Sequence, residues 1–159
     1  MYCFVKGEPE GQDAKRWLDH ATTLATACAR EIHGDDDRSW FHVVSAVRTA
    51  ASALWHRSPG RPSWSQLDAS TLSAFMERQE LSHEMMESYA FDVYVFFTFM
   101  RRHGLVSGAT ACSVQEKLWP VVAPLYERAM AMELGDADSE SAAAMLGATF
   151  ASTQPVGLA

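Results

Sequence analysis

The stretch YAFDVYVFFTFM, residues 89–100, decides the fold of this 159-residue chain. Six of its twelve residues are aromatic, and most of the others are aliphatic. A membrane-spanning helix needs about 20 consecutive apolar residues, but Asp92 interrupts this run, and Arg101 and Arg102 close it. We therefore exclude a membrane span. The stretch belongs to a protein core or to a surface that binds another molecule.

The spacing of the apolar residues favours a helix over a strand. Val, Tyr and Phe are good strand formers, but apolar side chains here occupy both sets of alternating positions, so no polar face emerges. A single stripe at spacings of three and four is typical of a helix. Because Ser82 can cap such a helix and Gly104 can end it, we expect a helix over about residues 82–103. The stripe consists of Met85, Tyr89, Val93, Phe96 and Met100.

The second half of this helix carries a further apolar face, formed by Phe91, Val95 and Phe99. A helix that is apolar on almost every side must be covered from several directions. One interpretation is a central helix surrounded by the others. In a second, the face stays open to a partner, either a second copy or another protein, because aromatic clusters anchor interfaces well. The third is the wall of a ligand or cofactor pocket.

Helical periodicity and capping signals extend over most of the remaining chain. The segment SPGRPSWS, residues 58–65, breaks this pattern because proline and glycine cannot continue a helix. We expect an all-α single domain over 1–135, a compact bundle of five or six helices around the aromatic one, and then a short Ala-rich helix and flexible C-terminal tail over 136–159. The other expected helices begin at Asp13, at Ser39, near Asp68 or Ser70, and at Ser113, where Ser113–Glu116 has capping-box spacing, and the last one is kinked or restarted at Pro120 and Pro124.

The bulk composition indicates an ordinary globular protein. Hydrophobic residues make up 48 % of the chain, and its length suits one domain. The three cysteines are odd in number and far apart, so no disulfide framework is expected. The first residues show no basic region followed by a long apolar run, so we expect no signal peptide and a cytoplasmic location.

The charge is acidic overall but unevenly distributed. The formal net charge of −7 argues against general binding to phosphate backbones. Residues 38–67 nevertheless carry four arginines and no acid, whereas both ends of the chain are acidic. This central segment either attracts a nucleic acid or an acidic partner, or lies beside the acidic ends of its own chain.

Residues 67–106 contain, in this order, Phe75, Tyr89, Phe96, Phe97, Arg101, Arg102 and Gly104. In this pattern the segment resembles the helical core-binding region that precedes the catalytic domain of tyrosine recombinases. The resemblance implies a DNA-binding module. Because no histidine has H-x-x-R spacing and no catalytic domain follows the segment in this sequence, we expect no strand cleavage. Contacts to phosphates would then come from Arg57, Arg61, Arg101 and Arg102.

One short motif bears on metal binding. Glu80 and His83 form an E-x-x-H pair, the spacing that di-iron helical bundles use on their inward faces. Such sites need a second pair and further glutamates, which the sequence does not offer. We therefore expect no metal and no cofactor, and Glu80 and His83 remain the only candidates for ligands of a metal-binding bundle.

No motif specifies a chemistry, since the sequence has no G-x-S-x-G and no phosphate-binding glycine loop. We therefore expect no enzyme but a non-catalytic, cytoplasmic protein–protein interaction module: an inhibitor, immunity protein, adaptor or regulatory protein. Its partner is another protein or a second copy of the chain, DNA binding and metal binding are the alternatives, and no membrane contact is expected. The predicted partner-binding residues are Phe91, Val95, Phe99, Trp55 and Trp64.

Overall fold

The structure of the protein is a computed structural model that describes residues 7–133. Within this range the chain is all-α, as predicted, and contains no strand. The expected Ala-rich helix and tail at 136–159 lie outside the described residues. The elements are α1 (Gln12–His33), α2 (Asp37–Arg57), the short 3-10 helix η1 (Trp64–Gln66), α3 (Ala69–Arg78), α4 (His83–Arg102) and α5 (Gly108–Glu133).

Side-chain caps set the beginnings of α2, α3 and α4. The Asp36 carboxylate accepts a hydrogen bond from the backbone N–H of Arg38 at 3.2 Å, so α2 starts slightly before the predicted Ser39. Asp68 accepts one from the N–H of Thr71 at 2.7 Å. The Ser82 hydroxyl accepts one from the N–H of Met85 at 3.2 Å. These side chains satisfy backbone donors that a helix start leaves unpaired.

The predicted start of α5 was wrong. The helix begins at Gly108 rather than at Ser113, because the hydroxyl of Ser107 accepts a hydrogen bond from the backbone N–H of Thr110 at 3.0 Å. Ser113 lies inside the helix with an exposed side chain. The helix then continues through Pro120 and Pro124 as one element, so it does not restart there.

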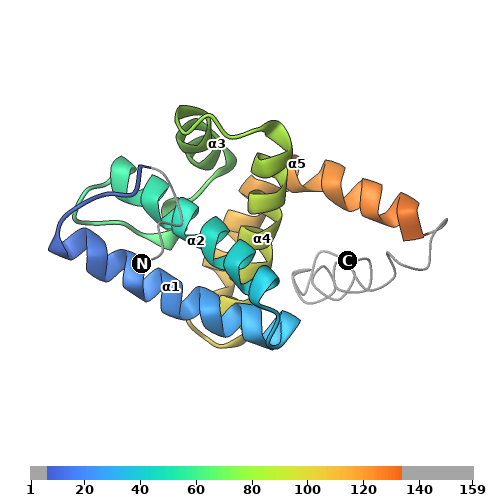
Figure 1. Cartoon of the computed structure of the whole chain (residues 1–159), viewed down its shortest axis with the longest axis horizontal. Helices are drawn as coiled ribbons and strands as arrows, with labels where there is room; N and C mark the ends of the chain where they lie inside the picture. The colour runs from blue at the N-terminus through green and yellow to red at the C-terminus, as the bar shows by residue number, and fades with distance from the viewer. Residues whose placement is uncertain (1–6, 134–159) are drawn as a thin grey trace.

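Helix α4 occupies the centre of the bundle, as expected. It contacts α1, α2, α3 and α5, while α1 packs mainly along α2 (Figure 1). Phe96, Phe97 and Val93 of α4 are fully buried within the main hydrophobic core. Burial of these aromatic side chains on several sides of one helix contributes substantially to stability.

Residues 7–133 contain no helix that is both long enough and apolar enough to cross a lipid bilayer. Most of the apolar surface of α4 is instead covered by neighbouring helices of the same chain.

Candidate functional site

The second apolar face of α4 is mostly closed. Val95 and Phe99 are each only 6 % exposed, and Phe91 is half-buried. Phe99 packs between Phe96 and His103, with ring centroids 6.5 and 4.5 Å away. The expectation that Val95 and Phe99 are exposed was wrong, because α4 lies in contact with α2 and with α5 and is covered from different directions. A role of Phe91 in partner binding stays a prediction.

The two tryptophans near the break between α2 and α3 differ in exposure. Trp64 is buried and packs against Trp17, Phe96 and Phe97, with ring centroids 4.9, 5.4 and 6.0 Å away. It is therefore a core residue of this chain rather than an exposed contact. Trp55 is half-buried, and its place in an interface stays a prediction.

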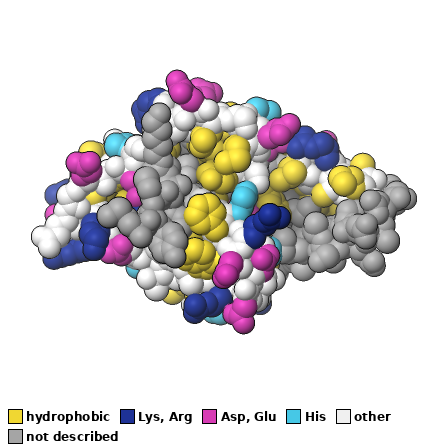
Figure 2. All heavy atoms as spheres, viewed as in Figure 1, with side chains coloured by type: hydrophobic (Ala, Val, Ile, Leu, Met, Phe, Trp, Pro, Cys, Tyr) yellow, Lys and Arg dark blue, Asp and Glu magenta, His cyan; other side chains and the backbone are white. Residues whose placement is uncertain are grey.

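Apolar surface is presented instead by the C-terminal part of α5, residues 123–133, which we call the α5 arm. The last buried residue of the helix is Val122, and none of the described side chains beyond it is buried. Figure 1 shows the arm extending past the other described helices, and Figure 2 shows hydrophobic side chains along it. Met130 and Met132 are 37 % and 55 % exposed. Helix α5 thus extends beyond the hydrophobic core and keeps apolar side chains on its surface there.

The four arginines proposed to contact phosphates are largely engaged within the chain. Arg57 donates to the carboxylate of Asp68 at 3.3 Å and to the hydroxyl of Thr71 at 2.6 Å. Arg101 donates to the sulfur of Cys112 at 3.6 Å. The remaining two also differ in surroundings: Arg102 lies 3.8 Å from Glu31, and Arg61 is exposed. DNA binding through these residues stays a prediction.

The E-x-x-H pair does not form a metal-binding cluster in the described structure. Glu80 lies in the turn between α3 and α4 with a φ of 59°, and His83 contacts Glu87 at 3.1 Å instead. Arg128 of α5 also donates a hydrogen bond to Glu87 and holds the pKa of that carboxyl below its usual value. Across residues 7–133, no three side chains among His, Cys, Asp and Glu come together as a metal site would require.

A chain of three polar side chains links α2 to α4. Nδ1 of His42 bonds to the carboxylate of Asp92, and Nε2 of His42 lies 3.2 Å from the hydroxyl of Ser88. The hydrogen bond to Asp92 raises the pKa of His42 above its ordinary value. This order of atoms is the one that orients a histidine as a base toward a serine hydroxyl. The same bonds also hold the two helices together.

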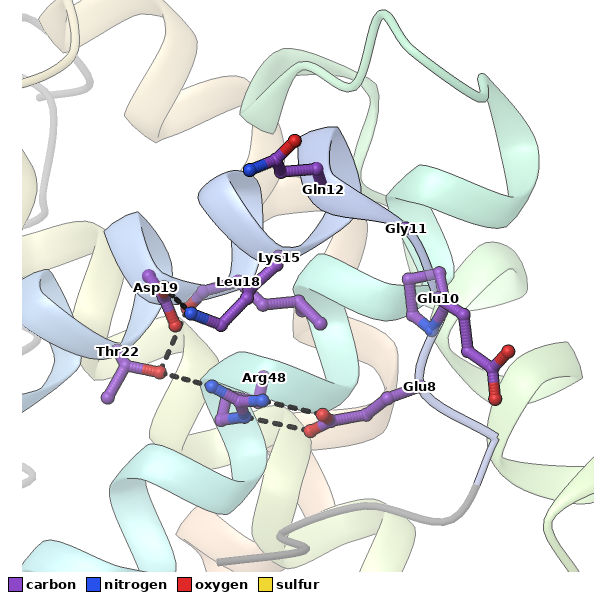
Figure 3. A pocket seen from close by; sticks show the side chains of 10 residues that line it. Glu8, Glu10, Gly11, Gln12, Lys15, Leu18, Asp19, Thr22 and Arg48 are labelled. Carbon is purple, nitrogen blue, oxygen red and sulfur yellow. Dashed lines mark hydrogen bonds and ion pairs between the residues drawn. The ribbon is translucent and has the colours of Figure 1, made fainter. Parts of the chain in front are cut away.

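A partly buried arginine, Arg48, lies beside a cavity at the start of α1 (Figure 3). The cavity has a volume of about 810 Å³ and is lined by residues 8–12, by one side of α1 and by Arg48 of α2. Two nitrogens of the Arg48 guanidinium donate to the two carboxylate oxygens of Glu8, at 2.8 and 2.5 Å. The other terminal nitrogen, Nη1, donates to the hydroxyl of Thr22 at 2.7 Å.

Sequence reasoning missed both polar groups, although each left a signal. Arg48 lies next to Val47 in the apolar part of α2, and Asp92 interrupts the aromatic run of α4. A charge within an apolar helical face needs a partner when it is buried. The partners themselves, Glu8 and His42, are 40 and 50 residues away in sequence.

No family model, curated protein or solved structure matches this chain.

Proposed function

We propose that this protein is a non-catalytic protein–protein interaction module whose partner-binding element is the α5 arm. The observation that carries the proposal is the apolar surface that continues along α5 after Val122, the last residue that the bundle buries. An inhibitor, an immunity protein, an adaptor or a regulatory protein would each act through such a surface.

The arm has the pattern of a helix that packs against another protein. Leu125, Ala129 and Met132 follow one another at spacings of four and three, which places them on one stripe. Met130 adds a second exposed apolar side chain. Complete burial of a methionine side chain contributes about 1.5–3 kcal/mol, and its flexible thioether adapts to irregular partner surfaces. A few such contacts are enough to anchor an interface.

The partner that fits is a protein with an apolar groove or an apolar helix face. A second copy of this chain is the first one to test, because two-fold homodimers are by far the commonest oligomers. Two arms would then contribute the same stripe to one self-complementary interface.

The test uses Met130→Glu/Met132→Glu in light scattering after size-exclusion chromatography and in affinity capture from the native host. The matched control is Leu105→Glu, which introduces charge at a site that is 49 % exposed in the turn after α4. We expect dimerisation, or capture of a protein, in the wild type and in the Leu105 variant, and its loss in the arm variant. The proposal would be overturned if the wild type is monomeric and captures no protein whose binding is lost in the arm variant.

The polar chain of Ser88, His42 and Asp92 favours a second candidate function, hydrolysis by a serine nucleophile. With Asp92 bonded to Nδ1, the neutral His42 presents Nε2 to accept the Ser88 proton. Backbone N–H groups inside a helix are used by the helix itself, so those around Ser88 do not offer the oxyanion donors that acyl transfer requires. For this reason the interaction role stands first.

Labelling with a fluorophosphonate separates the two candidates. An enzyme of this type would be labelled at Ser88, as identified by peptide mass spectrometry, and Ser88→Ala and His42→Ala would both lose the label. We expect no labelling of the wild type. Labelling at Ser88 that requires His42 would replace the non-catalytic proposal.

A further inference from the structure

The segment that precedes α1, residues 7–11, crosses α2 as a strap and places one carboxylate on a partly buried arginine. The side chain of Arg48 is only 12 % exposed, and that of Glu8 is 18 % exposed. The guanidinium offers two parallel N–H groups to the carboxylate, the geometry in which arginine recognises carboxylates most specifically. Thr22 of α1 fixes the remaining terminal nitrogen at 2.7 Å. The arginine is therefore held in place from the helix side as well as from the strap.

The strap itself is not part of any helix. Its two glycines, Gly7 and Gly11, have φ values of 80° and 106°, which other residues rarely adopt. The carbonyl oxygen of Gly7 lies 3.1 Å from Nε2 of His56. The carboxylate of Glu8 therefore lies on a loop that can move separately from the helices of the bundle.

Exchange of one carboxylate for another on Arg48 keeps the charges balanced. A buried pair is strongly destabilised when one partner is simply removed, because the other charge is left uncompensated. An incoming carboxylate supplies the same charge and the same two acceptor oxygens, while Glu8 moves into water. The remaining cost is the release of the strap.

The surroundings of Arg48 indicate the kind of anion. Pro9 and the side chain of Leu18 line the cavity beside the guanidinium, and they suit an apolar body attached to the carboxylate. Lys15 and Asp19 also line it and form an ion pair at 3.5 Å, so the charge that faces an incoming anion is mainly that of Arg48. One guanidinium matches a singly charged carboxylate better than a doubly charged phosphate.

We infer that Arg48 is the recognition group of a carboxylate-binding site, and that Glu8 occupies this site as a built-in competitor when no ligand is bound. The ligand is a small carboxylate with an apolar body, and it enters the cavity between the strap and α1. This inference is independent of the α5 arm, which lies on a different helix and is tested by different variants.

Titration calorimetry with benzoate as the probe tests the site in the full-length chain. In Glu8→Gln the competitor loses its charge, so benzoate is expected to bind at least about tenfold more tightly than to the wild type, because a tethered competitor acts at high effective concentration. The control is Glu10→Gln, which makes the same change in the same strap. Figure 3 shows the Glu10 side chain pointing away from Arg48, so this variant should bind benzoate as the wild type does.

A double variant, Glu8→Gln/Arg48→Met, removes the recognition group. Replacement of both members of a buried pair by less polar groups is often tolerated, so the protein should fold and bind no benzoate. Inorganic phosphate, titrated into Glu8→Gln, should bind more weakly than benzoate. If Glu8→Gln does not fold by circular dichroism, Glu8→Asp replaces it, with Glu10→Asp as the control and the same order of affinities expected.

Three results would overturn the inference. One is the absence of benzoate binding in the Glu8 variant, or binding no tighter than in the Glu10 variant. Another is benzoate binding that survives in the double variant, which would place the ligand elsewhere. The third is tighter binding of phosphate than of benzoate, which would show that the site selects charge rather than a carboxylate.

Discussion

At the scale of single residues, polar side chains within apolar helices help to specify how the helices pack against one another. Arg48 pairs with Glu8, and His42 pairs with Asp92, so each joins two parts of the chain that are far apart in sequence. Such pairs determine which faces of the helices meet, because a mismatch would leave a charge buried and alone.

The pair between His42 and Asp92 makes stability depend on pH. The pKa of His42 is raised above its ordinary value of 6.5 by the hydrogen bond to Asp92. Its contribution is fully present below 6.5 and is lost as pH rises through the higher folded-state pKa. Because the His42 side chain is 42 % exposed, we expect a modest effect.

Urea unfolding on both sides of this pH window measures the effect. The free energy of unfolding of the wild type should fall as pH rises, and this fall should shrink in His42→Gln. The control is His83→Gln, since His83 contacts Glu87 but is 77 % exposed. An identical pH dependence in the wild type and in His42→Gln would refute the role of the pair.

At the scale of secondary structure, local signals predicted α4 well and α5 poorly. Ser82 and Gly104 bound α4 as expected, because capping and chain reversal depend on neighbouring residues. For α5 two capping signals competed. The capping-box spacing at Ser113 was misleading, since Ser107 caps the helix earlier and residue 113 is already helical.

Serine substitutions distinguish the two starts of α5. Ser107→Ala removes the acceptor for the N–H of Thr110 and should lower the free energy of unfolding by about 1 kcal/mol. Ser113→Ala changes an exposed position inside the helix, where alanine is the better helix former, and should cost nothing. A larger loss for Ser113→Ala than for Ser107→Ala in chemical unfolding would contradict this start of α5.

Two phenylalanines of α4 test how its faces are covered. Phe97 is fully buried and Phe91 is half-buried. Phe97→Ala should destabilise the protein by about 3–5 kcal/mol, because it removes buried apolar surface and leaves a cavity. Phe91→Ala should cost clearly less in the same thermal or urea unfolding measurement. Equal losses would mean that the Phe91 side is covered as completely as the core.

At the scale of the whole molecule, α4 makes the helices interdependent. It contacts every other α-helix within residues 7–133, and η1 brings Trp64 against the same core. A bundle that shares one central helix cannot lose any helix without exposing part of that core. Small single domains of this kind usually unfold in one cooperative step.

Cooperative unfolding is therefore expected for the described helices. Far-ultraviolet circular dichroism reports the helices, and tryptophan fluorescence reports the surroundings of all five tryptophans, among them the packed pair Trp17 and Trp64. The two urea transitions should coincide in midpoint. Loss of the fluorescence transition before the helical one would show that the core around the tryptophans opens separately.

The sequence by itself determined the all-α class, the position of the central helix and the exclusion of a membrane span. These features follow from periodicity, caps and the charges that bound the aromatic run, all of which act between neighbouring residues. The bounds of residues 82–103 were predicted closely for the same reason.

Only the tertiary structure decided which apolar faces are covered. The periodicity of residues 89–100 cannot tell whether Val95 and Phe99 meet another helix of the chain or another molecule, because coverage depends on how distant helices pack. Likewise, Glu8 reaches Arg48 across 40 residues, and the apolar stripe of α5 continues past Val122. The exposed arm and the occupied arginine are thus products of packing rather than of local sequence.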